Sequence, residues 1–484
     1  MGCDRLLVTG LDTPWLQFFL SKNKHYIMNI KSIILAAGKG TRMCSNLPKV
    51  MHKVGGKPMF QHVIDTCRTL SDGGIIGVVG HSADEVITGI NDETIQWVHQ
   101  YEQLGTGHAV QQTTSFIDDD DVILIAYGDV PLVEEGTLGP LCRSIGEYDY
   151  ALLTTHLDDP HGYGRIVRNS SGEIRKIVEE KDANDDIRKI TEINTGIVAA
   201  KGKHLKRWLS LLDSKNAQNE YYLTDCVEHA VSEGARITSV NCADPDEIQG
   251  VNNRQQQAMV ERCYQFKKAT ELMAKGVTLL DPQRIDIRGE VTAGRDVVID
   301  VNAVLEGDVQ LGDGVFIEPN CVIKNSIIGP NVTVKSHSVI EDSNIGDSCD
   351  IGPFARIRPG TQLGSNAKVG NFVEIKKSKV GAGSKVSHLS YIGDTDMGCN
   401  VNIGAGTITC NYDGVNKFKT TIGDDVFVGS GSQLVAPVNI ANGTTVGAGS
   451  TITKDTPENR LTLSRSKQVS IPNWQRPIKK LIED

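Results

Sequence analysis

The chain has 484 residues, too many for one ordinary hydrophobic core, so we expect two or three domains. Its 60 acidic and 50 basic residues give a formal net charge of -10, which argues against general binding to nucleic acid or to an anionic membrane, since both need a basic face. No run of about eighteen apolar residues is present, so the sequence predicts no transmembrane helix and no membrane insertion.

Residues 1–27 precede the first recognisable domain. They lack both the basic start and the clean apolar stretch of a secretory signal. We therefore expect Met28 to be the natural start, and residues 1–27 to be an N-terminal extension that is disordered or never translated.

Residues 28–252 alternate between apolar runs and helical patterns. Ile33–Leu35, Ile75–Val79 and Val122–Ala126 have the composition of buried parallel strands, and Phe60–Leu70 has a helical pattern. The sequence therefore predicts an α/β domain, Rossmann-like, with a mostly parallel sheet. The charged, Gln-rich segment 253–276 carries apolar residues near helical spacing and predicts a linker helix.

A glycine-rich loop, residues 35–43, follows the first strand directly. Ligands of open α/β sheets bind at the carboxyl ends of strands, and Gly38 and Gly40 let backbone N–H groups approach a phosphate closely. Arg42 and Lys49 add positive charge. The loop is neither a Walker A motif nor a Rossmann fingerprint, because neither the Lys-Ser/Thr pair nor the third glycine is in place.

Two further segments suit a nucleotide site. Tyr127–Pro131 ends the most apolar strand, and Asp129 within it is a natural ligand for Mg²⁺, which takes one or two protein carboxylates and keeps waters and phosphate oxygens. An Asp that caps the next helix is the alternative interpretation. The polar segment Gln100–His108 contains glycines and suits recognition of a base edge through amide and backbone groups.

Residues 277–484 form a second predicted domain, because apolar residues recur every six positions between about Ile287 and Ile452. The repeat contains Ile299, Leu305, Leu311, Ile317 and Ile323, then Ile345, Ile351, Ile357, Leu363, Val369 and Ile375, then Ile422, Val428, Leu434, Ile440 and Val446. A helix needs spacings of three and four, so this period instead predicts a parallel β-helix. With roughly eighteen residues per coil, the stretch makes about nine coils.

Residues 405–417 interrupt this repeat with a loop of about ten extra residues, and insertions in solenoids commonly form the binding face. Polar groups that do not suit a dry aliphatic stack lie nearby: Arg358, Lys376, His388 and Tyr391. A lone histidine on a solenoid is otherwise a solvated surface residue, but histidine also titrates near neutrality and so suits a general base. The basic tail after Ile452 is either solvated or an arm that contacts an anionic ligand.

In their order along the chain, these motifs resemble the family of bifunctional N-acetylglucosamine-1-phosphate uridylyltransferases and glucosamine-1-phosphate N-acetyltransferases. The resemblance covers essentially Met28 to Lys480 and also rests on the segments His161–Arg165, Val178–Lys181, Asn194–Gly196 and Gly250–Asn253. It implies an enzyme that acetylates glucosamine-1-phosphate with acetyl-CoA and then transfers UMP from UTP to N-acetylglucosamine-1-phosphate, supplying precursors of peptidoglycan and lipopolysaccharide. It further implies that the β-helix is left-handed and that the protein is a homotrimer with acetyltransferase sites between neighbouring chains.

The resemblance also implies roles for particular residues. The UTP and UDP-N-acetylglucosamine site would contain Leu35, Ala36, Ala37, Gly38, Arg42, Lys49, Gln100, Gly105, Thr106, Tyr127, Gly128, Asp129, Gly164, Glu179, Asn194 and Asn252. Mg²⁺ would be held by Asp129 and Asn252. In the β-helix, His388 would be the catalytic base, and Glu374 is a candidate to orient it. The sugar phosphate would be held by Arg358, Lys376, Tyr391 and Asn402, and acetyl-CoA by Ala405, Asn411, Tyr412, Ser430, Ala448 and Arg465.

Two other functions compete with this one. A sugar-1-phosphate nucleotidylyltransferase with one activity would use the β-helix only for assembly or regulation, as the similar glucose-1-phosphate adenylyltransferases do. A non-catalytic scaffold would use the solenoid as a binding surface. The eleven cysteines are scattered with no C-x-x-C pair, which indicates neither a disulfide framework nor a zinc site and fits a reducing cytoplasm.

Overall fold

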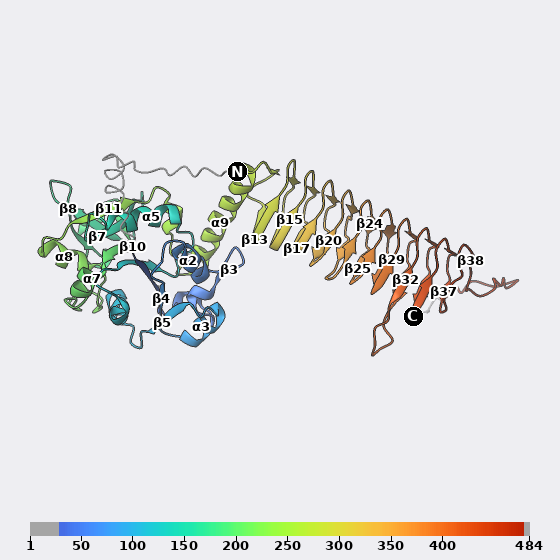
Figure 1. Ribbon diagram of the computed structural model, residues 1–484, viewed down its shortest axis with the longest axis horizontal. Helices are drawn as coiled ribbons and strands as arrows, with labels where there is room; N and C mark the ends of the chain where they lie inside the picture. Colours follow the sequence, from blue (N-terminus) through green and yellow to red (C-terminus); the bar gives the residue numbers. More distant parts are fainter. Residues whose placement is uncertain (1–28, 479–484) are drawn as a thin grey trace, which may run out of the picture. The chain divides into compact units, whose positions relative to one another are not determined.

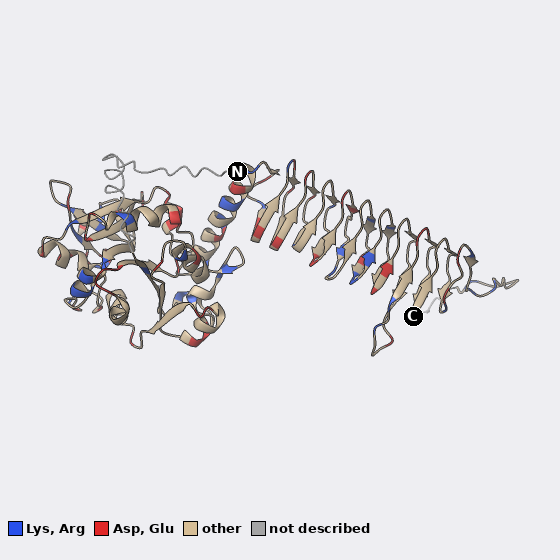
Figure 2. Ribbon diagram, in the orientation of Figure 1, with Lys and Arg blue, Asp and Glu red and all other residues tan. Residues whose placement is uncertain are grey.

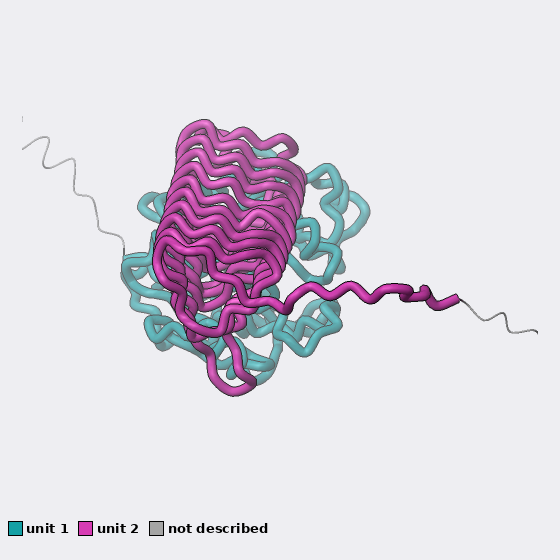
Figure 3. Tube along the Cα trace, turned by 90° about the vertical axis from the view of Figure 1, so that its right-hand side faces the viewer, with its two compact units in different colours: residues 1–54, 58–260 teal, residues 55–57, 261–484 magenta. Residues whose placement is uncertain are grey.

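A computed structural model of the chain describes residues 29–478. The expected N-terminal extension, residues 1–27, lies outside the described residues. The chain divides into two compact units, one formed by residues up to Val54 together with Pro58–Val260, and one by Gly55–Lys57 together with residues from Glu261 onward (Figure 3).

The first unit is built on a nine-stranded sheet with the order β11-β7-β10-β6-β1-β4-β5, to which β8 and β9 are attached. Its strands are β1 (Ile30–Ala36), β4 (Ile75–Val79), β5 (Ile95–His99), β6 (Val122–Tyr127), β7 (Tyr150–His156), β8 (Gly164–Arg168), β9 (Ile174–Val178), β10 (Glu192–Lys201) and β11 (Ile237–Asn241). Its helices are α2 (Met59–Arg68), α3 (Ala83–Ile90), α4 (Thr106–Gln111), α5 (Glu135–Ser144), α6 (Asp185–Arg188), α7 (Gly202–Leu209) and α8 (Asp225–Ser232). The longer α9 (Arg254–Ala274) lies within the segment expected to be a helix, and β2 (Lys53–Val54) pairs with β3 (Lys57–Pro58).

The predicted mostly parallel sheet is confirmed: β1 runs parallel to β4 and β6, and β4 runs parallel to β5. The exceptions are β10, antiparallel to both its neighbours, and the antiparallel β8–β9 ribbon. Alternate residues of β1 enter different cores, with Ile33 and Leu35 on one face and Ile34 and Ala36 on the other. Helices α2, α3 and α5 cover one face and α4, α7 and α8 the other (Figure 1). Both faces are therefore covered, which leaves the strand ends as the place for ligands.

The second unit is a parallel β-helix, as the six-residue repeat predicts. One sheet of eleven strands runs along it, namely β12 (Thr278–Leu279), β14 (Val298–Ile299), β16 (Phe316–Ile317), β18 (Thr333–Val334), β21 (Asp350–Ile351), β24 (Lys368–Asn371), β27 (Lys385–His388), β30 (Asn402–Ile403), β33 (Phe427–Val428), β36 (Thr445–Val446) and β38 (Leu461–Thr462). Eleven strands exceed the expected nine coils because pairing extends beyond the 287–452 stretch at both ends.

A second sheet of sixteen strands forms the other sides of the coils. Its strands are β13 (Ile285–Ala293), β15 (Ala303–Leu311), β17 (Val322–Ile328), β19 (Val339–Glu341), β20 (Asn344–Ile345), β22 (Arg356–Ile357), β23 (Gln362–Leu363), β25 (Glu374–Lys376), β26 (Lys379–Val380), β28 (Tyr391–Gly393), β29 (Thr395–Met397), β31 (Ile408–Cys410), β32 (Thr420–Ile422), β34 (Gln433–Val435), β35 (Val438–Ile440) and β37 (Thr451–Ile452). The repeat residues form one buried core through the stack, in which Ile323, Ile357 and Ile375 are each 0% exposed.

The spacing of the coils shows where the stack is interrupted. Bonded corner residues on neighbouring coils are 18 residues apart at Asn302 and Asn320, and 17 apart at Asn325 and Asp342. Across the predicted insertion the spacing grows to 25, between Cys399 and Asp424. The insertion therefore adds fewer residues than the ten expected, and its loop leaves the stack before β32 (Figure 1).

One corner of the coils carries a column of exposed side chains, which we call the corner column: His337, Phe354, Phe372 and Leu389. All four have positive φ, between 44° and 62°. The ring centroids of His337 and Phe354 are 4.8 Å apart, and those of Phe354 and Phe372 are 5.4 Å apart. The left-handed backbone is unusual for bulky residues, so these corners are held in place by the hydrogen bonds of the stack.

Lys and Arg are interspersed with Asp and Glu over both units, with no uniformly basic face in view (Figure 2). Within residues 29–478, no helix combines the length and the apolar character needed to cross a bilayer.

Candidate active sites

A cavity of about 370 Å³ lies at the carboxyl ends of β1 and β6 in the first unit. It is lined by Leu35, Ala36, Ala37, Gly38, Lys49, Val50, Gln100, Gln103, Gly105, Thr106, Ala109, Tyr127, Asp129, Glu220 and Asn252. Eleven of these fifteen residues were expected from the sequence. The cavity thus brings together the glycine-rich loop, the Gln100–His108 segment and the end of β6. Arg42, Gly128, Gly164, Glu179 and Asn194 are not among the lining residues.

The two expected Mg²⁺ ligands lie around one cationic nitrogen. Lys49 Nζ forms an ion pair with Asp129 and donates a hydrogen bond to Asn252 Oδ1 at 3.1 Å. Arg42 Nη2 donates to the same Oδ1 at 3.0 Å, and the N–H of Val251 donates to the carbonyl of Asp129 at 2.9 Å. A carboxylate and an amide oxygen that already share one cation are a donor set suited to Mg²⁺. Arg42 belongs to this site although it does not line the cavity.

Gly40 explains how the loop reaches Lys49. Gly40 has φ of 60°, and a Cβ there would lie 2.7 Å from the Cβ of Lys49. Only glycine therefore allows the loop to pack this closely against the lysine that pairs with Asp129.

The Gln100–His108 segment is folded back on itself inside the cavity wall. Gln100 is 3% exposed, and its Nε2 donates to the carbonyl of Gly105 at 3.1 Å and lies 3.0 Å from His108 Nδ1. A Cβ at Gly105 would lie 2.6 Å from the carbonyl oxygen of Tyr221. This long-range contact explains why the neighbouring Glu220 lines the cavity, which no local motif indicated.

Gly164, Glu179 and Asn194 form a second group beside the cavity. Gly164 pairs in register with Asn194, and a Cβ at Gly164 would lie 3.5 Å from both carboxylate oxygens of Glu179. Thr224 Oγ1 donates to Glu179 at 3.1 Å, whereas the buried Oδ1 of Asn194 has no hydrogen-bond partner among the described residues. A buried acceptor without a partner is costly, and a hydroxyl or amide of a ligand would satisfy it.

Tyr127 connects this group to the cavity. Burial raises the pKa of Tyr127, and the negative charges of Glu179 and Asp129 raise it further, so the phenol stays neutral. Burial also raises the pKa of Glu179. A Cβ at Gly196 would lie 2.7 Å from the Tyr127 ring, so this glycine makes room for it. The sixteen expected nucleotide-site residues thus gather around one end of the sheet.

In the β-helix, His388 ends β27 and is exposed. It pairs in register with Asn371 on the preceding coil, and its Nδ1 lies 3.0 Å from Asn371 Oδ1. Glu374, expected to orient the histidine, instead accepts a hydrogen bond from Arg358 Nη1 at 2.7 Å. Asn371, and not Glu374, therefore contacts the histidine. Glu374 lies on β25, where its register partner is Tyr391.

Three cationic side chains gather near Glu374. The ammonium group of Lys417 beside Lys376 lowers the pKa of Lys376, and Arg358 acts in the same direction. The hydrogen bond from Arg358 to Glu374 raises the pKa of Arg358, and Tyr391 adds to this. Lys417 comes from the insertion loop and was not singled out from the sequence, because its proximity depends on how that loop folds. Such a cluster suits a phosphate.

The remaining expected residues fall into two groups. Ala405, Ser430 and Ala448 occupy equivalent positions on successive coils: the N–H of Gly431 donates to Ala405 O at 2.7 Å, and Arg465 Nη1 donates to Ala448 O at 2.9 Å. Side chains here are small because the coils approach closely; a Cβ at Gly429 would lie 2.5 Å from the Ala448 nitrogen. Asn411 and Tyr412 belong instead to the insertion loop, where Asn411 bonds Asp394 and Tyr412 is 58% exposed. Asn402 begins β30, next to β27.

Comparison with known proteins gives matches in both units. Residues 32–195 match the MobA-like NTP transferase domain, residues 287–366 the GMPPB C-terminal domain, and residues 419–454 the bacterial transferase hexapeptide (six repeats). A curated relative, the bifunctional protein GlmU of Marinobacter nauticus, is 54% identical over 447 residues, which are 92% of this chain and 98% of the relative. A solved structure of a putative glucose-1-phosphate thymidylyltransferase from Bacillus anthracis, in complex with a sucrose, is 18% identical with a TM-score of 0.39, over 48% of this chain and 95% of that one.

Proposed function

The chain belongs to the family of the bifunctional protein GlmU, and on this premise we propose that it carries out two consecutive steps of UDP-N-acetylglucosamine synthesis. Residues 277–484 transfer an acetyl group from acetyl-CoA to glucosamine-1-phosphate. Residues 28–252 then transfer UMP from UTP to the N-acetylglucosamine-1-phosphate formed, with release of pyrophosphate. The observation that carries the second step is the convergence of Asp129 and Asn252 on one cationic nitrogen.

In uridylyl transfer, a phosphate oxygen of the sugar phosphate attacks the α-phosphorus of UTP, and the bond to pyrophosphate breaks. Both reactants are anionic, so the protein must position them and neutralise their charge. Lys49 and Arg42 supply two positive charges beside the cavity. Asp129 and Asn252 would hold Mg²⁺, which supplies further positive charge to the phosphates when bound. Gly164, Glu179 and Asn194 would hold the sugar.

In acetyl transfer, the amine nitrogen of glucosamine-1-phosphate attacks the thioester carbonyl, and the carbon–sulfur bond breaks to release coenzyme A. The amine must be neutral when it attacks, so a base has to take its proton. His388 is exposed for this role, and we assign its Nε2 as the acceptor because Nδ1 faces Asn371. Arg358, Lys376 and Lys417 would bind the sugar phosphate, and the small residues Ala405, Ser430 and Ala448 would leave room for acetyl-CoA.

We further propose that the protein is a homotrimer that assembles through its β-helices. Hexapeptide repeat domains suggest an oligomer. The corner column supports this, since Phe354, Phe372 and Leu389 are 47%, 56% and 63% exposed in the single chain. The column ends beside His388, so a neighbouring chain packed on it would reach the acetyltransferase site. No disulfide joins the cysteines within residues 29–478, which supports a cytoplasmic location.

Supplying glucosamine-1-phosphate, acetyl-CoA, UTP and Mg²⁺ to the purified protein tests both steps. The expected product is UDP-N-acetylglucosamine, formed with one coenzyme A and one pyrophosphate. Coenzyme A release without the nucleotide sugar would show that only the acetyltransferase site is active. Nucleotide sugar that forms only when N-acetylglucosamine-1-phosphate replaces glucosamine-1-phosphate would show that only the uridylyltransferase site is active. A metal chelator should stop pyrophosphate release and leave coenzyme A release intact.

A further inference from the structure

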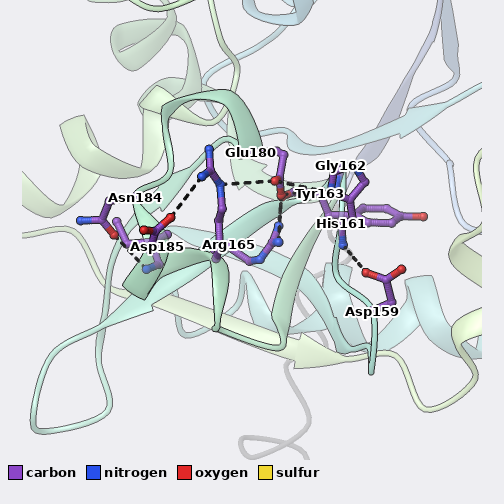
Figure 4. A network of polar contacts seen from close by, with 10 residues as sticks. Asp159, His161, Gly162, Tyr163, Arg165, Glu180, Asn184 and Asp185 are labelled. Atoms are coloured by element: carbon purple, nitrogen blue, oxygen red, sulfur yellow. Dashed lines mark hydrogen bonds and ion pairs between the residues drawn. The ribbon is translucent and has the colours of Figure 1, made fainter.

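A cluster of polar contacts centres on Glu180, next to the expected sugar-binding group (Figure 4). Its Oε2 accepts hydrogen bonds from Arg165 Nη2 at 2.9 Å and from the backbone N–H of Gly162 at 3.4 Å. Its Oε1 lies 3.6 Å from both His161 Nδ1 and Arg188 Nε. One carboxylate therefore connects β8, the loop before it and helix α6.

The Arg165 side of the Arg165–Glu180 ion pair is shielded from water, whereas the Glu180 side chain is 20% exposed. The Arg165 side chain is 2% exposed, and its Nη1 also donates to the carbonyl of Tyr163. A buried guanidinium needs a carboxylate partner, so the pair has a defined geometry. Burial acts to raise the pKa of Glu180, but the hydrogen bonds from Arg165 and Gly162 outweigh it and hold this pKa below its usual range. The carboxylate is therefore ionised at neutral pH.

This pair shares its backbone with the sugar-binding group. Within the β8–β9 ribbon, Arg165 pairs in antiparallel register with Val178, which brings the ends of the two strands together at Gly164 and Glu179. Arg165 follows Gly164 by one residue, and Glu180 follows Glu179 by one residue. Any change in how Glu180 holds the ribbon end is thus transmitted directly to the two residues expected to contact the sugar.

The loop that leads into Gly164 depends on the same carboxylate. Gly162 and Tyr163 each give one backbone group to the Arg165–Glu180 pair, and the His161 N–H donates to Asp159 Oδ1 at 3.2 Å, which closes the loop at its other end. Gly162 has φ of 86°, a conformation that glycine adopts without strain.

We propose that Glu180 is a positioning residue for the amino-sugar phosphate: by holding loop 161–164 against the end of β9, it sets the KM for N-acetylglucosamine-1-phosphate without affecting the UTP side. This inference rests on the proposed function. The nucleotide residues Lys49, Gln100 and Asp129 lie on other segments, so they are not held by Glu180.

Kinetics of three variants test this role in the full-length protein. Glu180→Ala should raise the KM for N-acetylglucosamine-1-phosphate about tenfold, since small misplacements of positioning groups cost one to two orders of magnitude. Glu180→Gln keeps an acceptor for Arg165 and Gly162. This variant should raise the KM for N-acetylglucosamine-1-phosphate about threefold, because charge-assisted hydrogen bonds are roughly twice as strong as neutral ones. Glu192→Gln is the matched control: it weakens the Glu192–Arg168 pair, at 2.6 Å, at the other end of β8. All three should keep the KM for UTP within about twofold, because the UTP-contacting segments are untouched.

Acetyl transfer by the second unit serves as an internal reference for the amount of intact protein, and the KM for UTP reports whether the first unit is folded. An unchanged KM for the sugar phosphate in a Glu180→Ala protein with normal acetyl transfer overturns the proposal, as does an equal rise in both KM values. If Glu180→Ala does not fold, Glu180→Gln decides by the same comparison. A wild-type protein that makes no UDP-N-acetylglucosamine would overturn the proposed function itself, which separates the two failures.

Discussion

His388 and Asn371 occupy the same register position on neighbouring coils, with Nδ1 of the histidine 3.0 Å from Oδ1 of the amide. An amide oxygen accepts hydrogen bonds, so it favours the tautomer that carries its proton on Nδ1. Nε2 then keeps a free lone pair. This contact with one residue of the preceding coil supports the proposed role of His388 as a base.

Replacing these two residues should separate their roles. His388→Ala is expected to lower kcat for acetyl transfer by about 10²- to 10⁴-fold, the usual contribution of a general base, and to spare uridylyl transfer. Asn371→Ala should cost less, about tenfold, because the imidazole remains and only its orientation is lost. Coenzyme A release measures the first activity and pyrophosphate release the second. Unchanged acetylation in the His388→Ala protein would remove this histidine from the mechanism.

Asp129→Ala is expected to abolish uridylyl transfer, lowering kcat by at least about 10³-fold, because the charge proposed to hold Mg²⁺ is lost. It should also leave Lys49 without its carboxylate partner. Acetyl transfer should stay nearly intact, since the altered residue belongs to the first unit. Full pyrophosphate release in this variant would show that the carboxylate has no part in the reaction.

Phe372→Lys tests the assembly proposal. The ring of Phe372 stacks on Phe354 at an exposed corner, so a charge there changes the surface of the coil without opening the core. We expect a shift from trimer to monomer in sedimentation, together with loss of acetyl transfer and retention of uridylyl transfer. Phe316→Lys, also at an exposed position of the β-helix but outside the corner column, is the control. A Phe372→Lys protein that remains trimeric would place the interface elsewhere.

Ile357→Ala tests the aliphatic core of the coils. Ile357 is 0% exposed, and truncating a buried isoleucine to alanine leaves a cavity that costs about 2–5 kcal/mol. Denaturant unfolding should show this loss in the transition of the β-helix. Ile408→Ala, at a 40% exposed position of a later coil, should cost well under half as much. Equal losses at both positions would mean that burial in the stack is not what stabilises the coils.

Asp225 predicts a pH dependence of the first unit. Burial raises its pKa from 3.8 to about 6, and the charges of Glu228 and Glu179 add to the rise. The folded state therefore holds this proton more tightly than the unfolded state, so the contribution of Asp225 to stability is most favourable below pH 4 and falls as the pH rises toward 6. Asp225→Asn removes that loss and should stabilise the unit at pH 8 by about 1 kcal/mol, a discounted value because the group is only half-buried and lies in the first turn of α8.

Thermal melts at pH 4 and pH 8 measure the Asp225 effect. The variant should melt above the wild type at pH 8, and the two should converge at pH 4. A variant that is less stable than the wild type at pH 8 would show that the ionised carboxylate makes a favourable contact.

The sequence was sufficient for those features that depend on local pattern. The apolar runs at Ile33, Ile75 and Val122 became buried strands, and the six-residue spacing of aliphatic residues became the core of the stack. Both follow from burial requirements that recur at a fixed period along the chain. The residues expected around the nucleotide cavity came from family resemblance, and most of them line one cavity.

Partners that are set by distant segments could not be predicted in this way. Asn371 replaces Glu374 beside His388 because of the register between two coils, and Glu220 enters the cavity wall because Tyr221 packs on Gly105. Glu180 likewise gained its role only when the β8–β9 ribbon placed it near Arg165. In each case the residue type is ordinary, and its neighbours in space are decided by strand pairing.

The stacked coils also make the second unit divisible in length. Each strand contacts mainly the strand one coil before and one coil after, so removing one whole coil of 17 or 18 residues would bring matching strands together again and shorten the rod by one step. Coils of 17 and of 18 residues both occur in the stack, so its corners absorb a difference of one residue while the later aliphatic side chains stay in the core. Evolution can therefore lengthen or shorten this half of the molecule in whole turns, while the spacing between His388 and its partners on adjacent turns is preserved.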